Sequence, residues 1–308
     1  MFDIIGDIHG HCDELEELLI KLGYTVKNGI YSHPVRKVIF VGDYIDRGPK
    51  IREVLHIVKK MTETRNAIAL MGNHEYNAIC FNYQQKIGGG YLRQHLIKNI
   101  TQHYETLNQF KSFQKEYDDY IEWFKTLPLF FETEEFRVVH ACWDNIHINY
   151  LKEQLIDNRL TNDLIYLSTI KGSKFNIAID ETLNGKRIKL PDGVEITTKD
   201  GNKRTKIRAK WWENTQIDID YRKISIELIY NLPNLIIDKS ILFKNHYKET
   251  EKPVFFGHYW LDGELSLFKN NICCLDYSVA KKGRLVAYKY DFENDLSSRK
   301  FVSINCNN

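Results

Sequence analysis

The sequence predicts an α/β fold, because short apolar runs alternate with amphipathic helical patterns through its first third. Three of these runs are each followed by a glycine and a polar cluster, at residues 6–10 (GDIHG), 42–48 (GDYIDRG) and 72–75 (GNHE). Asp43 follows Asp7 by 36 residues and Asn73 follows Asp43 by 30, about the length of one strand–helix–strand unit. Three neighbouring parallel strands would bring these clusters to the carboxyl edge of one sheet, where α/β proteins bind ligands.

The elements of this first third follow from the apolar spacing. The first strand is expected at residues 4–5 and a helix at 12–22, whose leucines share one face. Residues 38–41 form a continuous apolar run, which is typical of a strand covered on both faces. A second helical pattern covers 51–61, and a third strand is expected at 67–71.

The rest of the chain predicts two insertions within a single domain that spans residues 1–308. Residues 81–135 are expected to be helical, and residues 144–250 to be mixed, with a basic hairpin. Further short strands are expected at 136–140, 254–258, 272–275 and 285–290.

The expected hairpin pairs residues 188–190 with 194–196 around the turn signal Pro-Asp-Gly, and a second turn is expected at 199–202. Residues 186–210 contain nine lysines or arginines and three acidic residues, and Trp211 and Trp212 follow directly. The segment could grip a polyanion through charge and stacking. A solvated hairpin whose tryptophans close the core beneath it is the favoured interpretation, since charged runs are usually solvated faces.

Composition narrows the class of protein. Hydrophobic residues at 43% and charged residues at 27% are ordinary globular values, and a net charge of +2 indicates no polyanionic partner for the whole protein. No apolar stretch reaches 18 residues, and the first residues lack the basic start of a signal peptide. We therefore expect a soluble, cytoplasmic protein with no membrane partner. The six cysteines lack C-x-x-C spacing and are expected to be reduced and mostly buried.

The polar clusters offer the ligands that a pair of divalent cations would need. Such a pair takes one bridging ligand and further protein ligands on each metal. Asp7 and His9 could reach one metal from a turn after the first strand, and Asn73 could give its amide oxygen to the other. Asp43 lies between these clusters and can bridge the two, because a carboxylate has two oxygens.

Two more imidazoles are then required from further along the chain. His140 and His258 are each the first polar residue after an apolar strand-like run. With these two histidines the sequence predicts a two-metal centre.

The three clusters together resemble the G-D-x-H-G, G-D-x-x-D-R-G and G-N-H-E motifs of the metallophosphoesterases. More narrowly, they are similar to those of the phosphoprotein phosphatase superfamily, which includes bacterial diadenosine-tetraphosphatase-like and serine/threonine phosphatase-like enzymes. Weaker similarities continue at 136–141, 253–259 and 272–290, the last resembling the closing strands of the bacterial nucleotide-phosphatase branch. The resemblance implies a calcineurin-like fold, with a two-layered β-sheet core flanked by helices.

The resemblance also implies a role for each motif residue. One metal would be held by Asp7, His9 and Asp43, and the other by Asp43, Asn73, His140 and His258. The two divalent ions, manganese foremost with iron or zinc as alternatives, would activate a shared water for attack on phosphorus.

Three further residues would complete the chemistry. His74 would protonate the leaving oxygen, and Asp46 would bond its other ring nitrogen and fix the tautomer. Arg47 would bind phosphate oxygens through its planar fork. A second phosphate-binding arginine is usual in the family, and Arg208 is our candidate for it.

This sequence departs from the family pattern at two places. Ala141 follows His140 where many relatives have glycine, and alanine is still small enough for a close backbone approach. Tyr259 and Trp260 follow His258 where a smaller residue is common, which predicts a differently shaped site mouth with aromatic faces.

The favoured function is hydrolysis of phosphomonoester or phosphoanhydride bonds. Nucleotide polyphosphates are the expected substrates, because the insertions would roof the site and Tyr259 and Trp260 would stack a base. Phosphoproteins and RNA ends stay open as substrates, since the loops decide this choice. A catalytically inactive binding module and a nuclease that uses the basic hairpin are the alternatives. The complete set of motif residues argues against the inactive module.

Overall fold

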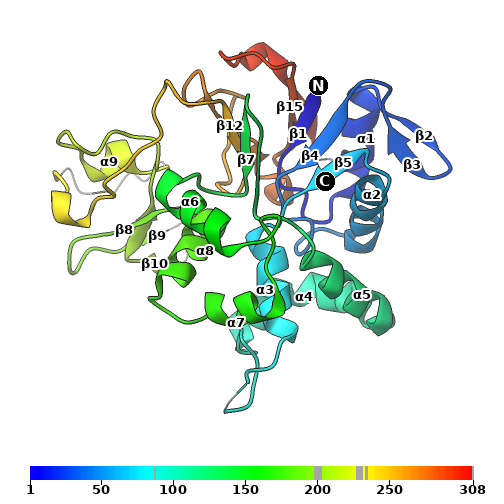
Figure 1. The fold of residues 1–308 in the computed structure, drawn as a ribbon, viewed down its shortest axis with the longest axis horizontal. Helices are drawn as coiled ribbons and strands as arrows, with labels where there is room; N and C mark the ends of the chain where they lie inside the picture. The colour runs from blue at the N-terminus through cyan, green and yellow to red at the C-terminus, as the bar shows by residue number, and fades with distance from the viewer. Residues whose placement is uncertain (87, 198–202, 227–231, 233–234, 307–308) are drawn as a thin grey trace.

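Two β-sheets packed face to face form the centre of the computed structural model, which describes residues 1–86, 88–197, 203–226, 232 and 235–306 (Figure 1). The first sheet has the strand order β14-β15-β1-β4-β5, with β16 paired to β15. Its strands are β1 (Phe2–Ile5), β4 (Lys37–Phe40), β5 (Ala67–Ala69), β14 (Asp276–Tyr277), β15 (Arg284–Tyr290) and β16 (Phe301–Asn305). The strands β1, β4 and β5 are parallel neighbours, as the motif spacing predicts.

The second sheet has the order β13-β12-β7-β6. Its central strand β12 runs parallel to both neighbours, and β6 closes one edge antiparallel to β7. The strands are β6 (Phe130–Glu132), β7 (Arg137–Val139), β12 (Val254–Phe256) and β13 (Ile272–Cys274).

Alternate residues of each strand face opposite sides, so each sheet contributes one face to a shared core. In β4, Ile39 lies in the apolar cluster between the sheets, whereas Phe40 lies in the larger cluster that includes the outer helices. Phe255 of β12 faces the same inter-sheet core and is fully buried. The predicted two-layered sheet core flanked by helices is therefore confirmed.

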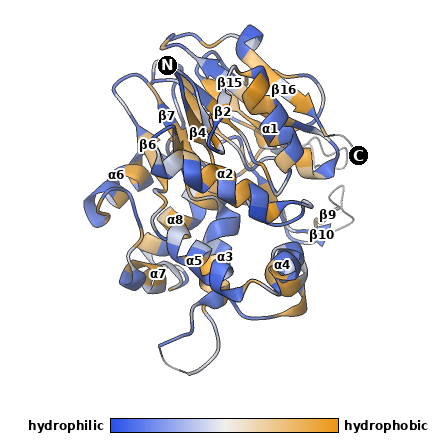
Figure 2. Cartoon of the chain, turned by 90° about the vertical axis from the view of Figure 1, so that its right-hand side faces the viewer, coloured by the Kyte–Doolittle hydropathy of each residue, from blue (hydrophilic) through white to orange (hydrophobic). Residues whose placement is uncertain are grey.

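Helices α1 (Cys12–Lys21) and α2 (Ile51–Glu63) cover the outer face of the first sheet, at the right of Figure 1. Both show hydrophilic and hydrophobic residues side by side in Figure 2, as expected for amphipathic helices. The next helix, α3 (Asn73–Asn82), begins four residues after β5 ends. The predicted helices at 12–22 and 51–61 are confirmed to within two residues at each end.

Residues 81–135 contain α4 (Ile97–Phe110) and α5 (Gln114–Phe124), and strand β6 lies near their end. The segment 144–250 is mixed. Its helices are α6 (Asn145–Gln154), α7 (Asn162–Ser168), α8 (Lys174–Asn184) and α9 (Tyr221–Ile224), and its strands are β8 (Arg187–Lys189), β9 (Ile196–Thr197), β10 (Lys203–Arg204) and β11 (Lys206–Arg208). A small hairpin of β2 (Thr25–Lys27) and β3 (Ile30–Ser32) and 3₁₀ turns at Lys239–Ile241, Val279–Lys281 and Ser298–Lys300 complete the described elements.

The predicted pairing of 188–190 with 194–196 is wrong. Strand β8 pairs with β11, which places Ile188 opposite Ile207, and β9 pairs with β10. The pairing follows packing, because both isoleucines lie in a separate apolar cluster with residues from α9 and its flanks. The turn predicted at 199–202 lies outside the described residues. The prediction for the two tryptophans is confirmed, since Trp211 and Trp212 are buried against Phe256.

The structure also bears on the expectations for the cysteines and for a membrane-spanning helix. All six cysteines are free thiols, and five of them are buried. Within the described part of the chain, we find no helix with the length and apolar character that a membrane crossing requires. The single-domain assignment of residues 1–308 stays a prediction.

Replacing Phe255 tests whether the core between the two sheets stabilises the fold. The ring of Phe255 lies 5.2 Å from that of Tyr288 and 5.3 Å from that of Tyr290, both on the first sheet. Phe255→Ala should lower the free energy of unfolding by about 3–5 kcal/mol, because it leaves a cavity between the sheets. Urea unfolding followed by circular dichroism measures this loss. The control Ile97→Ala, at an 84% exposed position, should change it by less than about 0.5 kcal/mol. Equal effects of the two variants would contradict the assignment.

Candidate metal centre

The six predicted metal ligands converge where the two sheets meet. Asp7, Asp43 and Asn73 follow the parallel strands β1, β4 and β5, so one sheet edge presents all three. His140 and His258 follow β7 and β12, and the second sheet therefore supplies the imidazoles from the other side.

The first group of ligand atoms lies around Asp43. The Nδ1 of His9 donates to the carbonyl of Ile45 (2.8 Å), so the other ring nitrogen, Nε2, carries a lone pair. This Nε2 lies 3.6 Å from Asp43 Oδ2, is buried, and has no hydrogen-bond partner among the described residues. Asp7 adjoins the group and accepts a hydrogen bond from the backbone N–H of His258 (3.0 Å).

The second group lies on the other oxygen of Asp43. Asp43 Oδ1 is 3.5 Å from Nε2 of His140. Asn73 Oδ1 lies 2.9 Å from the same nitrogen and 2.8 Å from Nδ1 of His258. His140 donates its Nδ1 proton to the carbonyl of Val41 (2.9 Å), which leaves a lone pair on Nε2.

In each group the lone pair of an imidazole Nε2 therefore faces a carboxylate or amide oxygen, which is also an acceptor and has no proton to donate. A divalent cation between these atoms would satisfy them, and mixed carboxylate, imidazole and amide ligands suit manganese, iron or zinc. The residues present thus fit two metal ions that share Asp43.

The electrostatics of the buried carboxylates agree with this arrangement. Burial raises the pKa of Asp7 well above its usual value, and the nearby carboxylates of Asp276 and Asp43 add to the rise. Burial also acts to raise the pKa of Asp43, but the surrounding histidines, His140 first, outweigh it and hold that pKa low. Burial lowers the pKa of His9 to about 3, so its imidazole is the neutral form that binds metals.

His74 and Asp46 form the predicted pair. His74 Nδ1 donates to Asp46 Oδ2, and its Nε2 lies 3.9 Å from Asp43 Oδ2, on the side of the metal ligands. Burial alone would lower the pKa of His74, but Asp43 and Asp46 together raise it. The raised pKa favours the protonated ring that an acid needs.

Two residues that the sequence motifs do not reveal bind the oxygen of Asp46 that does not contact His74. This oxygen, Oδ1, accepts hydrogen bonds from Thr106 Oγ1 (2.6 Å) and from His103 Nδ1 (2.7 Å), both on α4. Tyr117 of α5 in turn bonds to Nε2 of His103 (2.7 Å). The only sequence signal for this pair is the spacing of three residues, which places both on one face of a helix.

Glu75 belongs to the third motif, and the sequence alone assigns it no role. Its buried carboxylate accepts backbone hydrogen bonds from Gly72 (3.0 Å), Asp43 (2.9 Å) and Tyr44 (2.8 Å). Burial and the charge of Asp43 raise the pKa of Glu75 to about 7. The side chain joins the second and third motif loops.

The backbone of these loops is strained and tightly packed. Left-handed φ values, rare outside glycine, occur at His9 (46°), Asp43 (57°), Asp46 (69°), Arg47 (73°) and His258 (74°). Such strain concentrates at functional sites. At Gly257 a Cβ atom would lie 1.9 Å from Asp7 Oδ1, so only glycine lets β12 approach this carboxylate.

The predicted phosphate-binding arginines lie beside the metal ligands. Arg47 is exposed and holds its guanidinium 3.9 Å above the ring of Trp260. Arg208 Nη1 donates to the carbonyl of His258 (3.1 Å).

The prediction of Tyr259 as an aromatic face at the mouth is wrong. Tyr259 is 1% exposed and packs against Phe256, because its side chain faces the outer core of the second sheet. Trp260 is partly exposed, but its ring contacts Arg47 and Lys281, whose Nζ lies 3.8 Å from the ring centroid.

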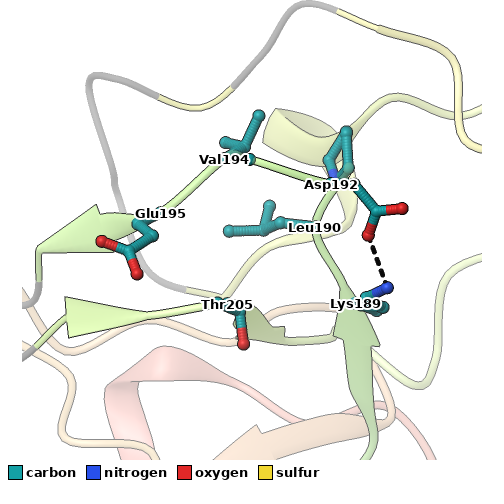
Figure 3. Close-up of a pocket in the computed structure, with 8 residues that line it drawn as sticks. Lys189, Leu190, Asp192, Val194, Glu195 and Thr205 are labelled. Atoms are coloured by element: carbon teal, nitrogen blue, oxygen red, sulfur yellow. Dashed lines mark hydrogen bonds and ion pairs between the residues drawn. The ribbon is translucent and has the colours of Figure 1, made fainter.

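Two other features lie apart from this centre. Asp144, His147 and Glu181 approach one another, but Lys186 Nζ already lies 2.6 Å from Asp144 Oδ2. A cavity of about 200 Å³ lies in the basic segment and contains none of the predicted site residues (Figure 3). Its charged lining residues are Lys189, Asp192 and Glu195, so it is no basic groove for a polyanion.

Two facing sheets with a cluster of carboxylates and imidazoles at their common edge define the metallophosphoesterase class. Residues 1–274 match the family described as calcineurin-like phosphoesterase, and the chain belongs to that family.

Similar curated proteins carry the name bis(5′-nucleosyl)-tetraphosphatase PrpE [asymmetrical]. The one from Oceanobacillus iheyensis is 36% identical over 140 residues, which are 45% of this chain and 54% of that protein. The one from Bacillus thuringiensis is 31% identical over 175 residues, 56% of this chain and 68% of that protein. The chain thus spans about half the length of the first of these relatives. The solved structure of a cold-active protein tyrosine phosphatase aligns over 99% of this chain and 78% of its own, with a TM-score of 0.49 at 17% identity.

Replacing Asp43 tests whether its carboxylate bridges two metal ions. Asp43→Asn removes the charge shared by the two ligand groups, so both metals should bind more weakly and turnover should fall by at least about 100-fold. Elemental analysis after dialysis measures metal per chain. The control Asp192→Asn, on an exposed carboxylate of the basic segment, should leave metal content unchanged. Two retained metals in Asp43→Asn would contradict the bridging role.

Proposed function

We propose that the protein is a two-metal-dependent phosphatase that hydrolyses phosphoanhydride or phosphomonoester bonds, with nucleotide polyphosphates as its substrates. The observation that carries the proposal is the pair of ligand groups on the two oxygens of Asp43, with His74 beside them. The family match and the names of the relatives support the same chemistry.

Each part of the site has a task in this reaction. Two divalent cations, when bound, would neutralise phosphate charge and lower the pKa of a water for attack on phosphorus. Asp7, His9 and Asp43 would hold one ion, and Asp43, Asn73, His140 and His258 the other. Arg47 and Arg208 would bind and orient phosphate oxygens.

His74 would give its Nε2 proton to the leaving oxygen. Asp46 accepts from Nδ1 and so orients Nε2 toward Asp43, on the side of the candidate metal ligands. The hydrogen bonds from His103 and Thr106 fix Asp46 in turn, which makes both of them positioning residues.

Manganese is the proposed metal, and iron and zinc fit the same ligands. We propose the cytoplasm as the location, because the six free cysteines suit a reducing compartment. Serine/threonine phosphatase activity, RNA 5′ ends as substrates, and an inactive binding module are the competing assignments.

One experiment separates these assignments. The metal-stripped protein is reloaded with manganese, iron or zinc and tested on diadenosine tetraphosphate, a phosphopeptide, RNA 5′ ends and an aryl phosphate. The proposal expects the highest kcat/KM on the nucleotide polyphosphate. A clear preference for the phosphopeptide would favour the protein-phosphatase assignment, and no turnover with any metal would favour the inactive module.

The role of His74 predicts a dependence on the leaving group. His74→Asn should lower kcat by about 10²–10⁴-fold on substrates with a poor leaving group, because these need the proton. The loss should be much smaller on p-nitrophenyl phosphate, whose leaving group scarcely needs protonation. Steady-state kinetics on both substrate types measure the difference.

Metal content in this variant is the control, because ligand atoms of His74, His9 and Asp43 lie within 4.8 Å of one another. It should match the wild type. Equal losses on both substrates, together with lost metal, would make His74 a ligand instead of the acid.

A further inference from the structure

Arg93 lines a small cavity together with Asp46, the residue that orients the candidate acid. Its Nη1 donates to Asn77 Oδ1 (2.6 Å), and its Nη2 donates to Gln102 Oε1 (2.7 Å). Both acceptors are neutral amides, and among the described residues no carboxylate lies within ion-pair distance of the guanidinium. Burial lowers the pKa of Arg93 and outweighs the charge of Asp46, which acts from further away and raises that pKa. A planar fork that neutral partners hold in place is well suited to bind an anion, since no carboxylate has to be displaced.

Asn77 joins this guanidinium to the face of α3 that carries His74. The two residues are three apart on α3, so their side chains are neighbours on one face of the helix, with Cβ atoms about 5–6 Å apart. Asn73, a proposed metal ligand, is the first residue of the same helix. Along α3 the order is therefore metal ligand, acid, and then the residue that holds Arg93.

A small cavity lies between the arginine and Asp46, the carboxylate that orients the acid. Arg93 and Asn77 line it together with Asp46 and His103, and its volume is about 10 Å³, room for one water-sized oxygen. Asp46 is the carboxylate in this cavity, but its oxygens already accept hydrogen bonds from three side chains. An oxygen of an incoming phosphate could fill this space and meet the guanidinium.

The chemistry of hydrolysis determines which part of the substrate lies beside His74. Water forms the new P–O bond, the bridging P–O bond breaks with its electron pair on the leaving oxygen, and His74 protonates that oxygen. The leaving group therefore lies on the His74 side of the site, and Asn77 holds Arg93 on the same face of α3 as His74. In a phosphoanhydride this group carries further phosphates, whereas in a phosphoserine it is a neutral alcohol.

We propose that Arg93 binds a phosphate of the leaving group and selects substrates in which the scissile phosphate is joined to further phosphates. This inference rests on the proposed function and names the feature of the substrate that the site recognises. The helical insertion supplies the selectivity, because Arg93 precedes α4 and Gln102 lies on it. An alcohol leaving group gains nothing from this contact.

Arg93→Gln tests the proposal in the manganese-loaded enzyme. The substrates are inorganic triphosphate, whose leaving group is pyrophosphate, and p-nitrophenyl phosphate, whose leaving group has no phosphate. The KM for triphosphate should rise by about 10- to 100-fold, and kcat/KM on p-nitrophenyl phosphate should stay within about twofold. Arg93→Lys should recover part of the affinity. The control Lys98→Gln removes an exposed positive charge from α4 and should change neither substrate.

Losses of equal size on both substrates would mean that Arg93 only ties α3 to α4, and an unchanged KM for triphosphate would exclude the contact. Either result overturns the proposal. Pyrophosphate binding, measured by calorimetry on the metal-loaded proteins, decides without turnover: about 10-fold weaker binding by Arg93→Gln supports the contact, and equal binding overturns it. A wild-type enzyme that hydrolyses neither substrate with any metal would instead refute the proposed function.

Discussion

The carboxylate of Asp43 is the group on which the rest of the centre depends. It is buried at the junction of two sheets, where an unpaired charge would be costly. Histidines face both of its oxygens, and the backbone N–H of His74 donates to Oδ1 (3.0 Å). Two cations that share this carboxylate would complete its compensation. Metal binding would therefore stabilise the loops around this carboxylate, since the candidate ligands come together only in the folded chain.

The two-sheet architecture follows from the same requirement. One sheet edge supplies carboxylate and amide oxygens, and His140 and His258 come from the facing sheet. The ligand set is complete only when the inter-sheet core, with Phe255 and Ile39 in it, is packed. Glu75 binds the backbone of the second motif loop, and Gly257 packs closely against Asp7, so these contacts hold the loops together at this edge. The strained φ angles of the motif residues are tolerated because these contacts hold the backbone from several sides.

The helical insertion acts on the other side of the site. From α4, His103 and Thr106 fix Asp46, which in turn directs the ring of His74. The same insertion brings Arg93 to the face of α3 that carries His74. The candidate metal ligands thus come from the ends of strands in two sheets, and the surroundings of the candidate acid come from a segment that is inserted between them. If the proposed roles hold, this division would place the chemistry on the sheets and substrate choice on the insertion.

The sequence by itself determined the parallel strands of the first sheet, the helices between them and the residues that converge on Asp43. These follow from local periodicity and from the rule that parallel strands end at one edge, so one spacing argument placed Asp7, Asp43 and Asn73 together. Only the tertiary structure decided the pairing of β8 with β11 and the burial of Tyr259, because both depend on which apolar surfaces meet. The contacts of His103 and Arg93 also join segments distant along the chain, and no local pattern encodes which residue lies opposite which.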